Sequence, residues 1–202
     1  MKYPVITISR EFGAGGRSIA KRLSEELGIP YYDKDIVARA AEKSGYTKEE
    51  IEREGEDISR ASHMLGGFLS FGAAAGYNNQ YDEIFRAQAK AILEFAQEPC
   101  ILVGRCADSI LREAGIDCFN VFLYADLEHR VHRIEERDHE QGAKVRKMVD
   151  KRDQQRKEYY KVYTGSELGD YHNYDISLDT GVIGYDQCVE IIAGIVRRRI
   201  QQ

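Results

Sequence analysis

The stretch "ITISREFGAGGRSIAKRLSEELG", from Ile6 to Gly28, contains a short β-branched strand, a glycine-rich turn, and a helix with apolar residues on one face. Glycines at such a turn let successive backbone N–H groups point inward, and the N-terminus of the following helix adds partial positive charge. The stretch therefore predicts a phosphate-binding loop between the first strand and the first helix.

The lysine that normally closes such a loop, in the pattern G-x-x-x-x-G-K-[ST], is missing. In one register, Gly16, Arg17 and Ser18 take the places of G-K-S, and Ser18 is the magnesium ligand. In the other, Gly15 is the last loop glycine, Gly16 takes the lysine position, and Ser18 contacts phosphate from further along the helix. The residues leave both registers open. The residues expected to bind phosphate are Arg10, Gly13, Ala14, Gly15, Gly16, Arg17 and Ser18.

A dinucleotide-binding turn fits the same residues about equally well. In the pattern G-x-G-x-x-G, Ser18 stands where the third glycine belongs. Asp33 or Asp35 would then be the acid that binds the ribose, about 20 residues further on. The rest of the chain has to decide between the two kinds of loop.

Length and composition limit the class of protein. The 202 residues fit one domain, and a net charge of −5 argues against nucleic acid as the partner. The N-terminus lacks the pattern of a signal peptide, and no stretch approaches the ~18 apolar residues of a membrane helix. The four cysteines form no C-x-x-C pair, so buried free thiols in a reducing compartment are expected. We therefore expect a cytoplasmic protein without membrane contact.

Strand-like and helix-like stretches alternate along the chain, which predicts a parallel sheet covered by helices on both faces. Further strands are expected at 100–105, 118–125 and near 174–180. Ligands of such sheets bind at the carboxyl ends of the strands. Residues 58–80 are rich in glycine, alanine and aromatic residues, and we interpret them as a mobile segment packed near a ligand or a partner.

Several motifs resemble those of bacterial cytidylate kinases, in the same order. The segment 6–18 resembles "ITIDGPSGAGKGT" without a gap, which favours the second loop register. "DKDIVAR" (33–39) falls on "DTGAMYR", and "LVGRCAD" (102–108) on "ADGRDMG". Further along, "VFLYADLEHRVHR" is similar to "IFLDAS…RAHRR", "DKRDQQR" to the arginine-rich lid "ERDDRDR", and "SLDTGVIGYDQCVEII" to "LDSTTLSIEQVIEKA". The chain is identified as a member of the cytidylate kinase-like family.

The resemblance implies a three-layer α/β P-loop kinase fold with a central parallel sheet and a helical lid. It implies one domain over 1–202, with a mobile acceptor-side segment at about 45–98 and a lid at about 139–165. The expected activity is ATP-dependent phosphorylation of a nucleoside monophosphate, with CMP as the first candidate. Mg²⁺ would be held through phosphates and water, without a metal site on the protein. Small nucleotides are the expected partners, and assembly into a homo-oligomer stays open.

By the same resemblance, Asp33, Arg39 and Arg105 bind the acceptor. The arginines expected to act on the triphosphate are Arg17, Arg133, Arg152 and Arg156. Those on charged helices, together with Arg130, have a solvated helix face as the alternative interpretation.

The chain also departs from the family's pattern. Val103 stands where the family has an aspartate, Cys106 replaces the acid after the arginine, and Gly16 occupies the lysine position in the favoured register. Losing one charged contact to a transition state costs on the order of 3 kcal/mol, or roughly a hundredfold in rate. A nucleotide-binding sensor or scaffold without turnover is therefore the alternative function.

Overall fold

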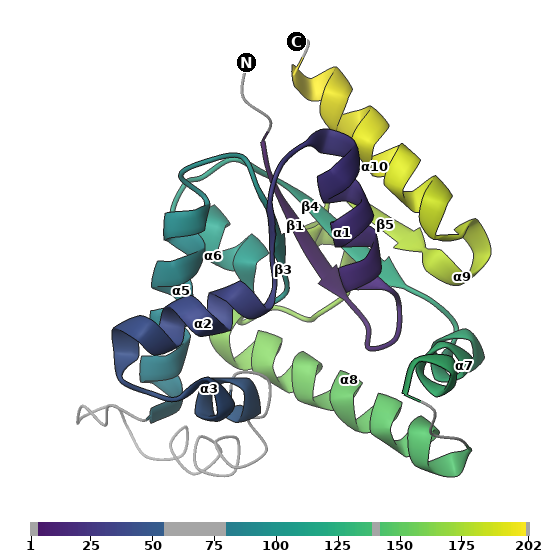
Figure 1. Cartoon of the computed structure of the whole chain (residues 1–202), viewed down its shortest axis with the longest axis horizontal. Coiled ribbons are helices and arrows are strands. Elements are labelled where there is room, and N and C mark those ends of the chain that lie inside the picture. The colour runs from purple at the N-terminus through teal and green to yellow at the C-terminus, as the bar shows by residue number, and fades with distance from the viewer. Residues whose placement is uncertain (1–3, 55–79, 139–141, 201–202) are drawn as a thin grey trace.

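A computed structural model describes residues 4–54, 80–138 and 142–200. Within these residues a five-stranded parallel sheet has the order β2-β3-β1-β4-β5 (Figure 1). The strands are β1 (Val5–Arg10), β2 (Tyr31–Tyr32), β3 (Ile101–Val103), β4 (Cys118–Tyr124) and β5 (Ile176–Asp179). The expected α/β sheet is confirmed. In dinucleotide-binding sheets the second strand lies beside the first, whereas here β3 lies between them, so the dinucleotide alternative is wrong.

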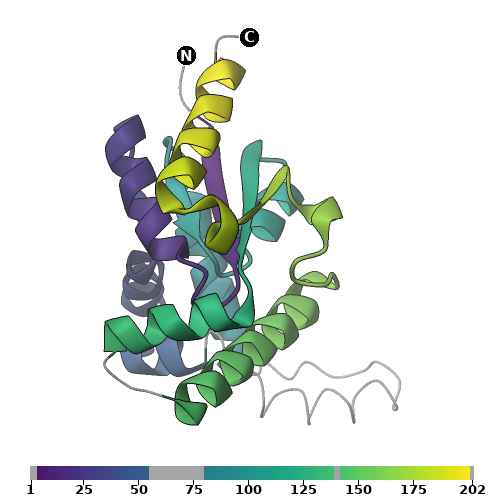
Figure 2. The same cartoon turned by 90° about the vertical axis from the view of Figure 1, so that its right-hand side faces the viewer.

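Helices cover both faces of the sheet (Figures 1 and 2). Helices α1 and α10 pack together on one face, and α5, α6 and the last turns of α8 cover the other. Helices α7 and α8 lie at the end of the molecule toward which the β1 arrow points. The helices are α1 (Gly16–Leu27), α2 (Lys34–Ser44), α3 (Lys48–Glu54), α5 (Gln80–Phe95), α6 (Ala107–Glu113), α7 (Leu127–Asp138), α8 (Ala143–Thr164), α9 (Thr180–Ile183) and α10 (Tyr185–Ile200).

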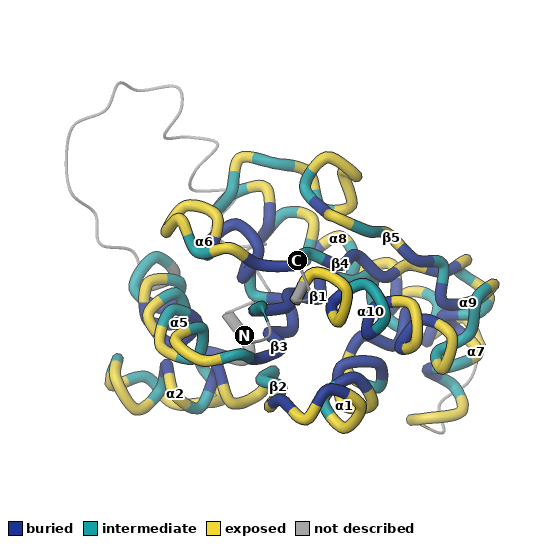
Figure 3. Tube along the Cα trace, turned by 90° about the horizontal axis from the view of Figure 1, so that it is seen from above, coloured by how far each residue is buried: buried dark blue, intermediate teal, exposed yellow. Residues whose placement is uncertain are grey.

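Two apolar cores follow from the two-residue alternation of side chains along the central strands. Ile6 and Ile8 of β1 point into the core beneath α1 and α10. Val5 of β1 and Leu102 of β3 point into the opposite core, beneath α5 and α6. Figure 3 shows buried backbone through the middle of the molecule and exposed residues on the outer faces of the helices. The sheet is therefore a rigid support whose strands end at a common edge.

The pattern T-x-x-E at 47–50 predicts a capping box for the helix that follows, and Asp126 is expected to cap the helix after the strand at 118–125. Both predictions are confirmed. Thr47 and Glu50 form the capping box of α3, with N of Thr47 2.8 Å from Oε2 of Glu50 and N of Glu50 3.2 Å from Oγ1 of Thr47. Asp126 caps α7 by accepting from N of His129 at 2.8 Å. Helix α6, between β3 and β4, is an element that the sequence patterns missed.

The expected acceptor-side segment and the expected lid are only partly described. Most of the segment 58–80 lies outside the described residues. Of the expected lid, the described part forms the 22-residue helix α8, which packs on α7 and places Tyr159 and Tyr160 in the core beneath α5 and α6. Mobility of the acceptor-side segment stays a prediction.

All four cysteines are buried and free, as expected. Burial raises the pKa of Cys100 to about 12 and that of Cys118 to about 11, so both thiols stay protonated at neutral pH. Among the described helices, none combines the length and apolar character needed to span a membrane.

Candidate functional site

The glycine loop joins β1 to α1 at the carboxyl end of the central strand. Gly13 and Gly15 both have φ +88°, in the left-handed region. A Cβ atom at Gly13 would lie 2.9 Å from the carbonyl oxygen of Arg130, and one at Gly15 would lie 2.7 Å from the ring of Tyr185. Glycine is therefore required at these two positions by the backbone and by close neighbours.

A matched pair of alanine substitutions separates these two requirements. Gly28 also has a left-handed φ, of +67°, but nothing lies within 4 Å of a Cβ atom there. Gly28→Ala should lower the free energy of unfolding by about 1 kcal/mol, the cost of the backbone conformation alone. Gly15→Ala should cost about 2–4 kcal/mol, because the ring of Tyr185 must also move. Urea unfolding of both variants tests this, and equal losses would contradict it.

Arg130 of α7 packs against the glycine loop, and its side chain is only 9% exposed. Its Nε donates to the carbonyl oxygen of Ala125 at 2.9 Å and its Nη1 to that of Phe12 at 3.1 Å. Arg130 also forms ion pairs with Glu11 of the loop and Asp153 of α8. Burial raises the pKa of Glu11, and the nearby Arg130 opposes this rise. Arg130 is thus a buried support of the loop, and its interpretation as part of a solvated face is wrong.

Asp153 reinforces the same support, since its Oδ1 accepts from the backbone N of Phe12 at 2.7 Å. A second contact comes from α9, where Oγ1 of Thr180 donates to the carbonyl oxygen of Ala14 at 3.0 Å. The loop conformation is therefore imposed by α7, α8 and α9, which lie far from it in the sequence.

Above the loop lies a pocket rich in cations, which we call the loop pocket. Gly13, Gly15, Gly16 and Ser18 form its base. Its cationic lining comes from Arg10, Arg17, Arg133, Arg137 and Arg156. Because these side chains come from β1, α1, α7 and α8, tertiary structure concentrates positive charge on a protein whose net charge is negative.

Arg133 of α7 forms hydrogen bonds with the loop and with the first turn of α1. Its Nη2 donates to Oγ of Ser18 at 2.9 Å and its Nη1 to the carbonyl oxygen of Gly13 at 3.3 Å. The guanidinium also lies 4.9 Å from the ring centroid of Tyr185, and burial lowers the pKa of Arg133.

Arg17 and Asp33 bridge the loop helix and α2. Nε of Arg17 lies 2.5 Å from Oδ2 of Asp33, whose side chain is 13% exposed, whereas that of Arg17 is 59% exposed. Asp33 stands at the N-cap position of α2 but accepts no hydrogen bond from that helix. Its carboxylate is directed toward the loop.

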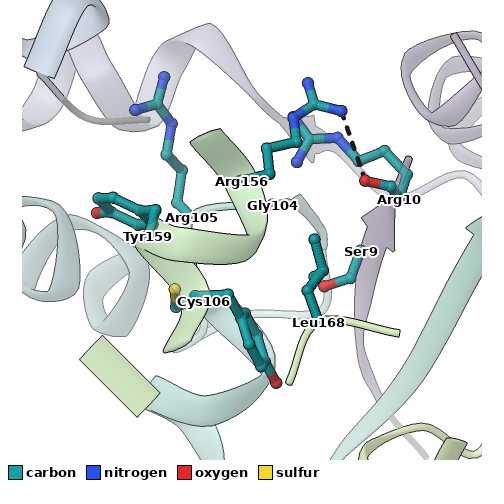
Figure 4. A pocket seen from close by; sticks show the side chains of 9 residues that line it. Ser9, Arg10, Gly104, Arg105, Cys106, Arg156, Tyr159 and Leu168 are labelled. Atoms are coloured by element: carbon teal, nitrogen blue, oxygen red, sulfur yellow. Dashed lines mark hydrogen bonds between the residues drawn. The ribbon is translucent and has the colours of Figure 1, made fainter. Parts of the chain in front are cut away.

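A second pocket adjoins the first, and we call it the arginine-105 pocket (Figure 4). Arg10, Arg105 and Arg156 approach it from the end of β1, the turn after β3, and α8. The remaining lining residues are Ser9, Gly104, Cys106, Tyr159, Tyr160 and Leu168.

The turn after β3 is strained. Gly104, Arg105 and Cys106 have φ angles of 73°, 58° and 56°, and the left-handed region is unfavourable for the last two. Nη1 of Arg105 is buried and has no hydrogen-bond partner in the described part of the chain. A buried cationic donor without a partner is costly. The arginine-105 pocket has a volume of about 20 Å³, so an anion would reach this donor only if the pocket opened.

Asp108 lies buried behind this pocket, where its Oδ2 accepts from the hydroxyl of Tyr160 at 2.6 Å. Burial raises the pKa of Asp108 above its ordinary value of 3.8. The folded state therefore holds this proton more tightly than the unfolded state, and it loses stability as the pH rises above about 3.8 toward the raised pKa.

Asp108→Asn removes this titration and should stabilise the protein more at pH 8 than at pH 4.5. The measurement is the difference in Tm between variant and wild type at each pH. The same difference at both values would contradict the raised pKa.

Two of the arginines expected in the site lie apart from both pockets. Arg39 of α2 is exposed and pairs with Glu42 and Glu94, at 3.3 and 3.5 Å. Arg152 is exposed on α8. Neither lines the loop pocket or the arginine-105 pocket. Among the described residues, no group of three or more histidine, cysteine or carboxylate side chains could hold a metal ion.

Known proteins resemble this chain over nearly its whole length. It is 25% identical to the cytidylate kinase of Thermoplasma volcanium, with 98% of this chain and 91% of the relative covered. The cytidylate kinase of Archaeoglobus fulgidus is also 25% identical, with 93% and 91% covered.

Solved structures agree on the fold. An uncharacterized protein from Eubacterium ventriosum matches with a TM-score of 0.71 and 25% identity, with 96% of this chain and 98% of that chain covered. Shikimate kinase from Acinetobacter baumannii matches with a TM-score of 0.54 and 13% identity over 98% and 94% of the two chains, which shows the P-loop kinase fold. The model of the cytidylate kinase-like family matches residues 5–182. The chain belongs to the cytidylate kinase-like family.

Proposed function

We propose that this protein transfers the γ-phosphoryl group of ATP to a nucleoside monophosphate, with CMP as the first candidate acceptor. The observation that carries the proposal is the pair of adjoining pockets, which share Arg10 and Arg156 as lining residues. A donor phosphate on the glycine loop and an acceptor phosphate beside Arg105 would meet at these two arginines. The curated relatives named cytidylate kinase support the same reaction.

On the donor side, the loop backbone and the N-terminus of α1 would bind the triphosphate. Arg133 and Arg156 line the loop pocket and would neutralise charge that develops on the transferred group. Arg17 would also contact the triphosphate if it exchanged Asp33 for the ligand. Arg152 lies outside the loop pocket, so it would contact the triphosphate only if α8 moved.

On the acceptor side, the buried Nη1 of Arg105 would bind the monophosphate. Arg39 would contribute only after exchanging Glu42 and Glu94 for the ligand. Asp33 would act from the rim of the loop pocket, which it lines.

The donor set of the loop pocket fits Mg²⁺ bound mainly through the nucleotide. Hydroxyl and carboxylate oxygens are the ligands that this ion prefers, and it usually keeps several waters. The loop pocket offers the hydroxyl of Ser18 and the carboxylates of Glu11 and Asp33, without a protein cage. Bound with ATP, the ion would neutralise phosphate charge, while the arginines orient the phosphates.

Turnover with a panel of nucleoside monophosphates tests the proposal. ATP with CMP should yield ADP and CDP, and each nucleotide should raise the Tm of the protein. Binding of ATP without phosphoryl transfer to any acceptor would support the alternative, a nucleotide sensor, which the glycine in the lysine position favours. No binding of any nucleotide would contradict both.

A further inference from the structure

Gly16 differs from the other glycines of the loop. Its φ lies outside the left-handed region, so its backbone accepts any residue. The atoms that a Cβ at Gly16 would meet all belong to the side chain of Arg10, with Cγ at 3.0 Å, Cδ at 3.3 Å and Cβ at 3.4 Å. The stem of Arg10 passes directly over Gly16, so a larger residue at this position would have to displace it.

The far end of the same side chain lies against Gly104. A Cβ atom at Gly104 would overlap Nη1 of Arg10 and lie 2.8 Å from its Cζ. The Arg10 side chain therefore runs from the start of α1 to the turn that carries Arg105. It lines both the loop pocket and the arginine-105 pocket.

The usual loop pattern has glycine at its first position and lysine directly after its last glycine. In the register that ends at Gly15, the first position is Arg10 and the lysine position is Gly16. The cation and the glycine have thus changed places. A lysine at the start of the helix and an arginine at the end of β1 would occupy the same space above the loop.

Resting on the proposed function, we propose that Arg10 replaces the missing lysine as the cation that contacts the transferred phosphoryl group, and that Gly16 and Gly104 make room for it. Arg10 fills this role better than Arg17. The Arg17 side chain is 59% exposed, whereas the Arg10 side chain crosses the lysine position itself. An arginine fork can bind two phosphate oxygens at once, which suits a cation between donor and acceptor.

The test returns the cation to position 16 and the glycine to position 10, in single and double variants. For each variant, calorimetry measures the affinity for MgATP, and an assay measures turnover with the best monophosphate acceptor. Arg10→Met keeps an unbranched stem over Gly16 but removes the charge, and it should lower kcat about 100-fold. Arg10→Gly should lose as much. Gly16→Lys alone crowds the Arg10 stem and should weaken ATP binding about 10-fold. The double variant Arg10→Gly/Gly16→Lys restores the usual pattern and should come within about 10-fold of wild-type kcat.

Two control variants account for general effects of the substitutions. Gly194→Lys adds a lysine to α10 where nothing lies within 4 Å of a Cβ atom, and Arg198→Ala removes an exposed arginine from the same helix. Both should keep wild-type activity, and thermal unfolding of every variant checks that it is folded.

The outcomes separate the two proposals. Activity of Arg10→Met at the wild-type level, or a double variant no better than Arg10→Gly, would overturn the role of Arg10 while the kinase function stands. A wild-type protein that binds no ATP and transfers no phosphate would overturn the proposed function, and this role with it.

Discussion

Arg130→Met is expected to lower the free energy of unfolding by about 3–5 kcal/mol, because it removes a buried cation and leaves the partly buried carboxylates of Glu11 and Asp153 without their partner. The same change removes the hydrogen bond to the carbonyl oxygen of Phe12, so the loop should also lose its conformation. Urea unfolding measures the first effect, and the loss of an ATP-induced rise in Tm measures the second.

A matched control for this variant lies on the surface of α8. Arg146 pairs with Glu128, but the two side chains are 43% and 74% exposed. Exposed pairs contribute little, so Arg146→Met should leave the urea midpoint nearly unchanged. If the two substitutions had equal effects, burial of the Arg130 cluster would not be what stabilises the loop.

Arg105→Ala is expected to lower kcat/KM for the monophosphate acceptor about 100-fold, since it removes a cation whose Nη1 is buried on the acceptor side. Affinity for ATP should stay at the wild-type level, because Arg105 does not line the loop pocket. Calorimetric titration of each nucleotide separates the two sites.

The conservative variant Arg105→Lys sharpens this prediction. It keeps the charge but loses the planar fork, so its kcat/KM should lie between those of the wild type and the alanine variant. If the Arg105 variants bound ATP more weakly but bound the monophosphate acceptor as the wild type does, the arginine-105 pocket would be the ATP site. This result would contradict the assignment of the two sites.

The missing lysine is a weaker argument against turnover when the other cations around the loop are taken into account. Taken alone, Gly16 suggests a loop that binds without turnover. In the structure five arginines line the loop pocket, and the side chain of one of them, Arg10, passes over Gly16. The positive charge that phosphoryl transfer needs is therefore available from other elements, and the assay with Arg10 variants decides whether it serves that purpose.

Local patterns were sufficient for the elements whose cause is local. The β-branched stretch at Ile6 and Ile8 and the apolar face of α1 predict a strand and a helix from neighbouring residues alone. The capping box at Thr47 and Glu50 depends on residues three apart, and it is present as expected. The order of motifs along the chain also predicted the fold and the family, which the sheet order and the comparisons confirm.

The sequence could not predict which arginines come together around the loop and which pair elsewhere. Arg130 and Arg133 lie three residues apart on α7, yet one is buried beneath the loop and the other faces the loop pocket. Arg39 resembles an acceptor-binding residue by its motif, yet it pairs with Glu94 of another helix. These differences depend on how helices distant in sequence pack around the edge of the sheet, because burial and ion pairing are properties of that packing. Strands, helices and family thus follow from the order of residues, whereas the conformation of the loop and the burial and pairing of its arginines follow from tertiary contacts.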